Sequence, residues 1–318
     1  MIENTESLSR PPTSFEYGSD WAFRRLTLTM AILCIGVVVV LVAQIALAAS
    51  PAIREYGAEF LTTSKWSAKD NAFGIAPQIG GTLYSSILGV ALGTIFGVAV
   101  AIFLTQDFMP YKWAIVIKNI VELLAAIPSV VYGLWGIFVL IPLVRGPANW
   151  LHSHFGGFFL FDSRLSGPGL LPSALVLAIM VLPTVTAISR DAIAAVPHKL
   201  REAAYGLGAT RWEAVAGVIL PTASRGIYGS IILAFGRAVG ETMALAMLFG
   251  NSNTFSWSLF APGNTLAALM ANQWSESSDV EKGALMYAGL VLLGITLAIN
   301  ILGTLLIMRT AAAAEAKQ

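Results

Sequence analysis

The sequence has few charged residues, almost no net charge and a single cysteine. Of its 318 residues, 12% are charged and 56% are hydrophobic, whereas soluble domains carry about 25% charged residues. This composition excludes an ordinary soluble domain. The formal net charge of +1 disfavours nucleic acid as a partner. Because Cys34 is the only cysteine, the chain can form neither an intrachain disulfide nor a cysteine-based metal site.

Two sequence signals are also missing. The chain has no Gly-x-x-x-x-Gly-Lys-Ser/Thr loop, the element that usually holds the phosphates of ATP. We therefore expect no catalytic residue, no metal and no cofactor on this chain, and any ATP to be hydrolysed by a partner. The first 26 residues are too polar for a signal peptide, and no cleavage site follows the first apolar run. That run is expected to stay as an anchor.

What the sequence does contain is a series of apolar runs long enough to cross a bilayer. Pro128-Ser129 is expected to break or kink the third run, which also contains Pro142, and Pro183 to kink the fourth. The pattern predicts an all-α integral membrane protein with six transmembrane helices, a disordered cytoplasmic tail over residues 1–26 with a short interfacial segment, and a second tail over 310–318. The predicted spans are 27–49, 80–105, 113–144, 170–189, 226–249 and 284–308.

The distribution of Lys and Arg predicts the orientation of these spans. With both termini in the cytoplasm, the inner segments hold twelve cations and the outer loops six. The inner cations are Arg10, Arg24, Arg25, Lys112, Lys118, Arg190, Lys199, Arg201, Arg211, Arg225, Arg309 and Lys317. The outer ones are Arg54, Lys65, Lys69, Arg145, Arg164 and Lys282. The polar segment 190–225 is therefore predicted to face the cytoplasm.

Residues 190–225 read as two short helices rather than a slack connector. The pattern predicts helices over 199–207 and 210–219, separated at Gly208, which can adopt the left-handed conformation that ends a helix. Thr210 and Glu213 have the spacing of a capping box. Pro221 is expected to stop the second helix before the next span begins. A loop this long and this structured is expected to dock on a partner.

Arg237 and Glu241 lie near the middle of the predicted fifth span. Charges at this depth are costly and usually functional, and an i,i+4 spacing places both on one helix face. Gly236 and Gly240 leave room beside them for a ligand or a second subunit. Arginine offers a planar fork of donors that matches oxyanions such as phosphate. The alternative is an ion pair that only fixes packing.

Other features have simpler interpretations. Gly89, Gly93 and Gly97 form a smooth ridge on which another helix can pack. Glu122 lies one turn from Lys118 and is expected to form an interfacial ion pair. His152 and His154 fall in a predicted outer loop, 145–169, with no third ligand nearby, so a surface or partner contact is favoured over a metal site.

Segment 190–225 resembles the "EAA" loop that permeases of ABC importers insert into their ATPase. The resemblance rests on Glu202-Ala203-Ala204, Gly208 and Leu220-Pro221. The family usually has Ile two residues before the Leu-Pro pair, where this chain has Val218. The resemblance implies that Glu202, Ala203, Ala204, Gly208, Arg211 and Pro221 couple the chain to an ATPase.

Two further motifs resemble the C-type permease subunit of phosphate-specific ABC importers. They are Gly236-Arg-Ala-Val-Gly-Glu-Thr-Met243 and Glu122-Leu-Leu-Ala-Ala-Ile-Pro-Ser-Val-Val-Tyr-Gly133. The resemblance implies a type I permease core over 80–309, with 190–225 as its coupling loop. It also implies a substrate path through Arg237, Glu241, Thr242 and Ser129.

The same resemblance implies partners and a location. The partners are an A-type phosphate permease in a heterodimer, a dimer of ATP-binding subunits, a periplasmic phosphate-binding protein and membrane lipid, in the bacterial inner membrane. A permease for sulfate or molybdate is the nearer alternative. A gradient-driven anion transporter is less favoured, because such folds usually carry internal repeats and the Arg-Ala-Val-Gly-Glu pattern does not recur.

Overall fold

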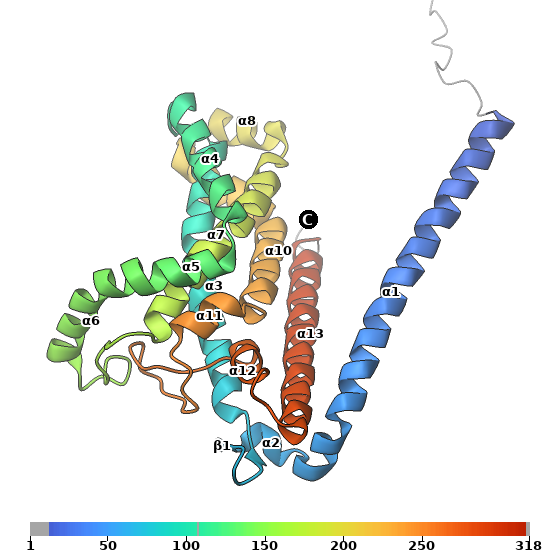
Figure 1. Cartoon of the computed structure of the whole chain (residues 1–318). Coiled ribbons are helices and arrows are strands. Elements are labelled where there is room, and N and C mark those ends of the chain that lie inside the picture. Colours follow the sequence, from blue (N-terminus) through green and yellow to red (C-terminus); the bar gives the residue numbers. More distant parts are fainter. Residues whose placement is uncertain (1–12, 107, 316–318) are drawn as a thin grey trace, which may run out of the picture. The chain divides into compact units, whose positions relative to one another are not determined.

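The computed structural model describes residues 13–106 and 108–315, and these residues are almost entirely helical (Figure 1). Six of the described helices are long and apolar enough to cross a membrane: 15–56, 76–105, 129–155, 170–194, 211–239 and 279–309. The predicted all-α class with six spans is confirmed.

The elements follow in chain order. They are α1 (Ser14–Tyr56), α2 (Glu59–Thr62), β1 (Trp66–Ser67), β2 (Ala72–Phe73), α3 (Ala76–Thr105), α4 (Tyr111–Ala126), α5 (Ser129–Trp135), the π-helix η1 (Gly136–Leu140), α6 (Ile141–Phe155), α7 (Leu170–Ala194), α8 (His198–Gly206), α9 (Arg211–Ala214), the π-helix η2 (Val215–Ile219), α10 (Leu220–Val239), α11 (Met243–Leu248), α12 (Leu266–Gln273) and α13 (Asp279–Glu315).

The chain divides into two units, residues 1–48 and 49–318. The first unit contains most of α1, which begins at Ser14. The prediction of a disordered tail up to residue 26 is therefore wrong for residues 14–26, and residues 1–12 lie outside the described part. Thr13 explains the early start, because its backbone N–H donates to Glu16 and its Oγ1 accepts from the Glu16 N–H. Such a capping box satisfies donors that the first turn leaves free.

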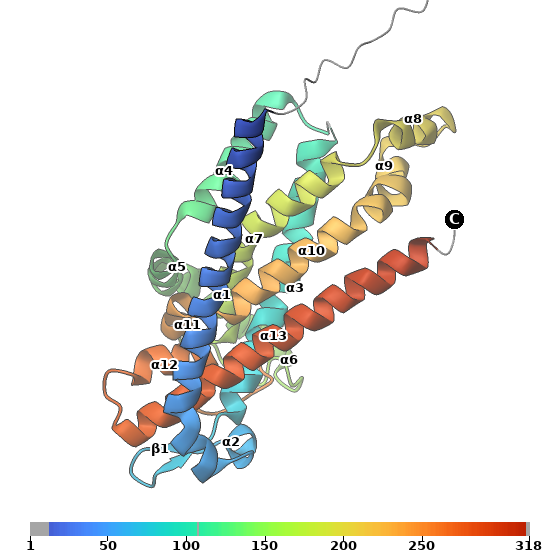
Figure 2. The same ribbon diagram turned by 90° about the vertical axis from the view of Figure 1, so that its right-hand side faces the viewer.

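In the second unit, α3 and α7 pack along the glycine ridge. A Cβ atom added at Gly89 would lie 2.6 Å from Leu177, and one at Gly97 would lie 2.9 Å from Val185. Only hydrogen atoms at these positions let the two helices approach so closely. The predicted packing face is confirmed, and Figure 2 shows α3, α7 and α10 running side by side.

The prolines act in two different ways. At Pro128 the predicted break is confirmed, because α4 ends at Ala126 and Ile127 is extended, as a residue before proline prefers. The predicted third span, 113–144, is therefore wrong as one helix: α4 stands apart, and the span-length helix runs over 129–155.

Pro142 and Pro221 interrupt nothing, because a π-helical turn precedes each of them. Leu220 donates its N–H to the Val215 carbonyl, five residues back, and Ile141 donates in the same way to Gly136. This wider turn accommodates the proline that follows, whose ring would otherwise clash with a carbonyl of the preceding turn. The prediction that Pro221 stops the helix before the next span is wrong: residues 211–239 form one helical run.

The outer segments are more ordered than the sequence suggested. Residues expected as loop form a β1–β2 hairpin, in which Trp66 pairs with Phe73. The Trp66 indole donates to the buried Glu281 carboxylate of α13 at 3.2 Å. His152 and His154 lie in the last turn of α6 rather than in a loop, and the His152 ring nitrogen Nδ1 lies 2.7 Å from the Phe161 carbonyl oxygen.

Candidate functional site

The loop predicted to couple the chain to a partner lies beyond one end of the bundle, where α3 ends and α4 begins (Figure 1). The two expected helices are present as α8 and the run that starts with α9. Gly208 separates them with a φ of +87°, which confirms the left-handed turn. Thr210 caps α9, since its N–H donates to Glu213 Oε2 at 2.8 Å and its Oγ1 accepts from the Glu213 N–H. The predicted capping box is confirmed.

Most of the loop residues that were expected to contact an ATPase are exposed. Glu202, Ala203, Arg211 and Pro221 are exposed, whereas Ala204 is buried. Ala204 therefore packs inside the chain and does not present its side chain to a partner. Leu207 is 91% exposed and Trp212 is 62% exposed. The sequence analysis assigned neither residue to the contact, although an apolar residue on each side of a helix break was the available signal.

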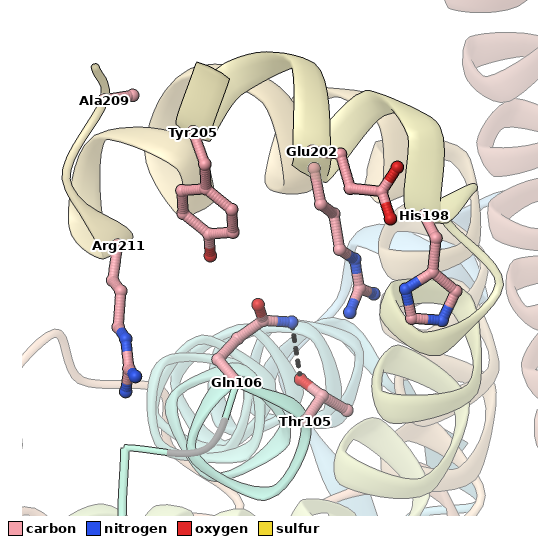
Figure 3. Close-up of a pocket in the computed structure, with 8 residues that line it drawn as sticks. Thr105, Gln106, His198, Glu202, Tyr205, Ala209 and Arg211 are labelled. Atoms are coloured by element: carbon pink, nitrogen blue, oxygen red, sulfur yellow. Dashed lines mark hydrogen bonds between the residues drawn. The ribbon is translucent and has the colours of Figure 1, made fainter. Parts of the chain in front are cut away.

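A cavity of about 470 Å³ lies between α8 and the end of α3 (Figure 3). In Figure 3 the Tyr205 hydroxyl and Gln106 point toward each other across this cavity, and Arg211 lies at one edge. Gln106 donates to Thr105 Oγ1 at 3.3 Å, and Arg201 donates to the Ile193 carbonyl at 2.7 Å. The Arg201 bond ties α8 to the last turns of α7.

The intramembrane motif does not lie on one helix. Arg237 is in the last turn of α10, which ends at Val239. Glu241 and Thr242 belong to a short break, and α11 begins at Met243. The prediction that Arg237 and Glu241 share one helix face is therefore wrong, as is the single fifth span over 226–249. Gly240 permits the end of the helix, and Thr242 helps to hold the break by donating to the Gly240 carbonyl at 3.1 Å.

Glu241 is engaged with the backbone that follows it. Its Oε1 accepts a hydrogen bond from the Ala244 N–H at 3.2 Å, which places the carboxylate at the first turn of α11. Among the described residues no ion pair joins Arg237 to Glu241. Arg237 is exposed and Glu241 is half-buried. In this conformation the guanidinium remains available to a ligand.

The two helix breaks of the core lie close together. α5, which follows the Pro128 break, packs on α11, which follows the Gly240 break (Figure 1). The contact is tight, because a Cβ atom at Gly133 would lie 2.7 Å from the Met247 sulfur and one at Gly136 would lie 2.7 Å from Leu248. Backbone that is not helical at membrane depth is tolerated where it is buried in protein or lines a water-filled path.

Tyr132 connects these breaks and was missed by the sequence analysis. It is buried, and its hydroxyl donates to the Leu124 carbonyl in the last turn of α4 at 2.8 Å. It also packs in one buried cluster with Ala244 and Leu248 of α11, beyond the Gly240 break. Ser129, an expected path residue, is half-buried at the start of α5. Tyr132 stands within the sequence motif that contains Ser129, but a tyrosine in an apolar run looks like core.

Comparisons with known proteins identify the kind of chain this is. Residues 89–311 match the family of binding-protein-dependent transport system inner membrane components. The phosphate transport system permease protein PstC of Mesorhizobium japonicum is 40% identical over 264 residues, covering 81% of this chain and 80% of that protein. PstC of Haemophilus influenzae is 37% identical and covers 90% of this chain and 92% of that protein.

Solved structures share the fold at lower identity. A bacterial ABC transporter involved in the import of the acidic polysaccharide alginate aligns with a TM-score of 0.60 and 16% identity, covering 92% of this chain and 96% of that chain. The MetNI methionine ABC transporter in an inward-facing conformation aligns with a TM-score of 0.56 and 18% identity, covering 74% and 95%.

Proposed function

Since the chain belongs to the PstC family of binding-protein-dependent permeases, we propose that it conducts inorganic phosphate as one permease subunit of an ATP-driven importer. It is a multi-pass membrane protein and not an enzyme. The substrate path that we propose runs along the two helix breaks, past Arg237, Glu241, Thr242 and Ser129.

One observation carries this assignment: Arg237 is exposed beside the Gly240 break and is not paired with Glu241. A guanidinium at membrane depth needs either a permanent partner or a function. Its planar donors suit a tetrahedral oxyanion, which can accept two parallel hydrogen bonds from them. Phosphate is therefore the substrate that fits both the family and the exposed group.

Energy for transport would enter at α8 and α9. The exposed Leu207 and Trp212 give this loop an apolar surface on which a cytoplasmic ATPase can dock. The same contact would include four other residues of the loop: Glu202, Ala203, Gly208 and Arg211. From Arg211 the chain is helical without interruption to Val239, and Arg237 is about 40 Å away along that run at 1.5 Å per residue. A displacement at the docking surface would therefore move Arg237 as part of one rigid element.

The remaining parts of the assembly follow from the family. We assign as partners an A-type phosphate permease, which completes the path in a heterodimer, two ATP-binding subunits that hydrolyse ATP, and a periplasmic phosphate-binding protein. The family implies a bacterial inner-membrane location, and the excess of Lys and Arg in the inner segments supports an orientation with α8 and both termini in the cytoplasm.

The test is ATP-dependent uptake of radiolabelled phosphate into vesicles that contain this chain with its permease partner and ATPase. Arg237→Gln should abolish most uptake while the chain still inserts, because Gln keeps hydrogen-bonding capacity but loses the permanent charge and the fork. Arg237→Lys should restore uptake only in part. Arg309→Gln, at an exposed position near the end of α13, is the matched control and should transport normally.

The same assay separates the alternatives. Uptake of sulfate or molybdate in preference to phosphate would assign the chain to another oxyanion. Uptake that persists without the ATPase would identify a gradient-driven carrier. Normal phosphate uptake by Arg237→Gln would contradict the proposed role of Arg237.

A further inference from the structure

Outside the Arg237 region and the coupling loop, two cations line a cleft between α3, α4 and α7. Two adjoining cavities of about 410 and 120 Å³ share Leu104, Lys118 and Arg190 in their walls. We name this hollow the α4–α7 cleft, defined by Leu104, Lys118, Glu122, Thr186, Ala187 and Arg190. The first turns of α4, which contribute to its walls, lie at the same end of the bundle as α8 (Figure 1).

Each cation of the cleft is paired with a carboxylate that is itself largely exposed. Lys118 Nζ lies 3.7 Å from Glu122 Oε1, and the two side chains are 51% and 62% exposed. A pair this long and this exposed contributes little free energy. Arg190 donates through Nε and Nη2 to Asp191, and among the described residues its Nη1 has no hydrogen-bond partner. Lys118 can therefore turn toward an anion at small cost, and Arg190 can offer Nη1 to an anion while it stays bound to Asp191.

Helix α4 forms one wall of the cleft and ends at the Pro128 break. Lys118, Glu122 and Ala125 follow at helical spacing along the wall that α4 contributes. About 9 Å beyond Lys118, at 1.5 Å per residue, the Leu124 carbonyl accepts the hydrogen bond from Tyr132. Tyr132 packs in one buried cluster with Ala244 and Leu248 of α11, the helix that follows the Gly240 break. Helix α4 thus runs from the two helix breaks to Lys118, which lines the cleft together with Arg190.

We infer that the α4–α7 cleft is a second phosphate-binding site, in which Lys118 and Arg190 hold the anion after it leaves Arg237. The inference rests on the proposed phosphate transport and names a further site for it. Arg190 offers directed donors and Lys118 a mobile point charge, and both side chains line the same two cavities. Glu122 forms an ion pair with Lys118 while the cleft is empty. The anion replaces Glu122 as the partner of Lys118 when it binds.

A phosphate group could also come from a lipid headgroup at the membrane surface. A headgroup would anchor the chain, whereas transported phosphate would exchange with the aqueous phase. The two sources differ in their dependence on lipid composition, so the test is run in vesicles of neutral phosphatidylcholine and in vesicles that also contain anionic phosphatidylglycerol.

The experiment uses a single cysteine as a reporter in the complete importer. Ala187 is exposed in the wall of the cleft, and the native cysteine is removed by Cys34→Ser. The rate at which an anionic methanethiosulfonate modifies Ala187→Cys is followed by the mass of this chain. Phosphate should slow the modification, whereas chloride at the same ionic strength should not. Ala195→Cys, exposed at the end of α7 and outside the cleft wall, is the matched control and should be insensitive to phosphate.

We expect phosphate at about four times its dissociation constant to slow modification of Ala187→Cys about fivefold, because about one fifth of the sites are then empty. Lys118→Gln and Arg190→Gln should each remove this protection, whereas Lys118→Arg should keep it, in both kinds of vesicle. Absence of protection in an importer that takes up phosphate normally would overturn the second site alone. So would protection that survives both Gln substitutions, or protection that requires anionic lipid. Absence of phosphate uptake by the unmodified importer would instead overturn the proposed function, and the second site with it.

Discussion

Substitutions at Gly208 test how ATP hydrolysis is coupled to transport, because they perturb the left-handed turn between α8 and α9. It separates α8 from α9 with a φ of +87°, and a Cβ atom at this position would meet no atom within 4 Å. A substitution is therefore opposed by the backbone conformation and not by crowding inside the chain. For alanine, the left-handed region costs about 1–2 kcal/mol. That changes the ratio of formed to unformed turn by a factor of about 5–30.

Three substitutions distinguish this strain from a clash at the docking surface. Asn and Asp tolerate the left-handed region better than Ala does, so strain alone predicts that Gly208→Ala is the most harmful of the three. A docking surface that rejects bulk predicts the opposite order, with Gly208→Ala the mildest. A surface that rejects negative charge predicts that Gly208→Asp is worse than Gly208→Asn.

The measurement is the number of phosphate ions transported per ATP hydrolysed, in vesicles that contain the complete importer. Gly206→Ala is the matched control: it is two residues away, has no atoms within 4 Å of the new Cβ and lies in α8 with ordinary helical φ. We expect Gly208→Ala to lower the ratio, Gly208→Asn to lower it less, and Gly206→Ala to leave it unchanged. Wild-type ratios for Ala, Asn and Asp at position 208 would refute the role of this turn in coupling.

Three further substitutions test the core and the path. Gly93→Leu should destabilise the chain by about 1–3 kcal/mol or more, because it overpacks the contact with Val181 on α7, and it should lower the midpoint of thermal unfolding in detergent. Tyr132→Phe leaves the Leu124 carbonyl without its donor, a loss of about 1–3 kcal/mol that should also lower that midpoint. Glu241→Gln keeps an oxygen that can accept the Ala244 N–H, but it loses the carboxylate that can accept a hydrogen bond from a phosphate hydroxyl. With an ATPase that works without the binding protein, the ratio of sulfate to phosphate transported by this variant should rise. An unchanged ratio would exclude a role of Glu241 in selecting phosphate over sulfate.

Short-range sequence signals predicted most of the coupling loop and one of the two helix breaks. Gly208, the Thr210–Glu213 capping box and the Pro128 break each follow from rules that involve only a few neighbouring residues, and all three are confirmed. The start of α1 was equally available, because Thr13 and Glu16 have capping-box spacing. It was missed because the polar composition of residues 1–26 was read as a tail.

The errors arose where a long-range argument replaced a local one. An apolar run over 226–249 is long enough to cross a membrane, so it was taken as one helix. The overlooked signals were Gly240, which favours the end of a helix, and Thr242, which favours the start of the next one. Conversely, Pro221 was taken as a stop because its ring clashes within an α-helix. The π turn that precedes it removes this clash, and no short sequence signal announces such a turn.

Together these corrections change how motion at the coupling loop would reach the substrate. Had the predicted helix over 210–219 ended before Pro221, a displacement there would pass through a flexible joint before it reached Arg237. Instead the π turn keeps residues 211–239 continuous, and the first interruption comes at Gly240, just after Arg237. The rigid segment therefore ends where the guanidinium lies, while Glu241 stays with α11 and the packed α5. A small rotation of α10 would then change the separation of Arg237 from Glu241, which two residues on one helix could not do.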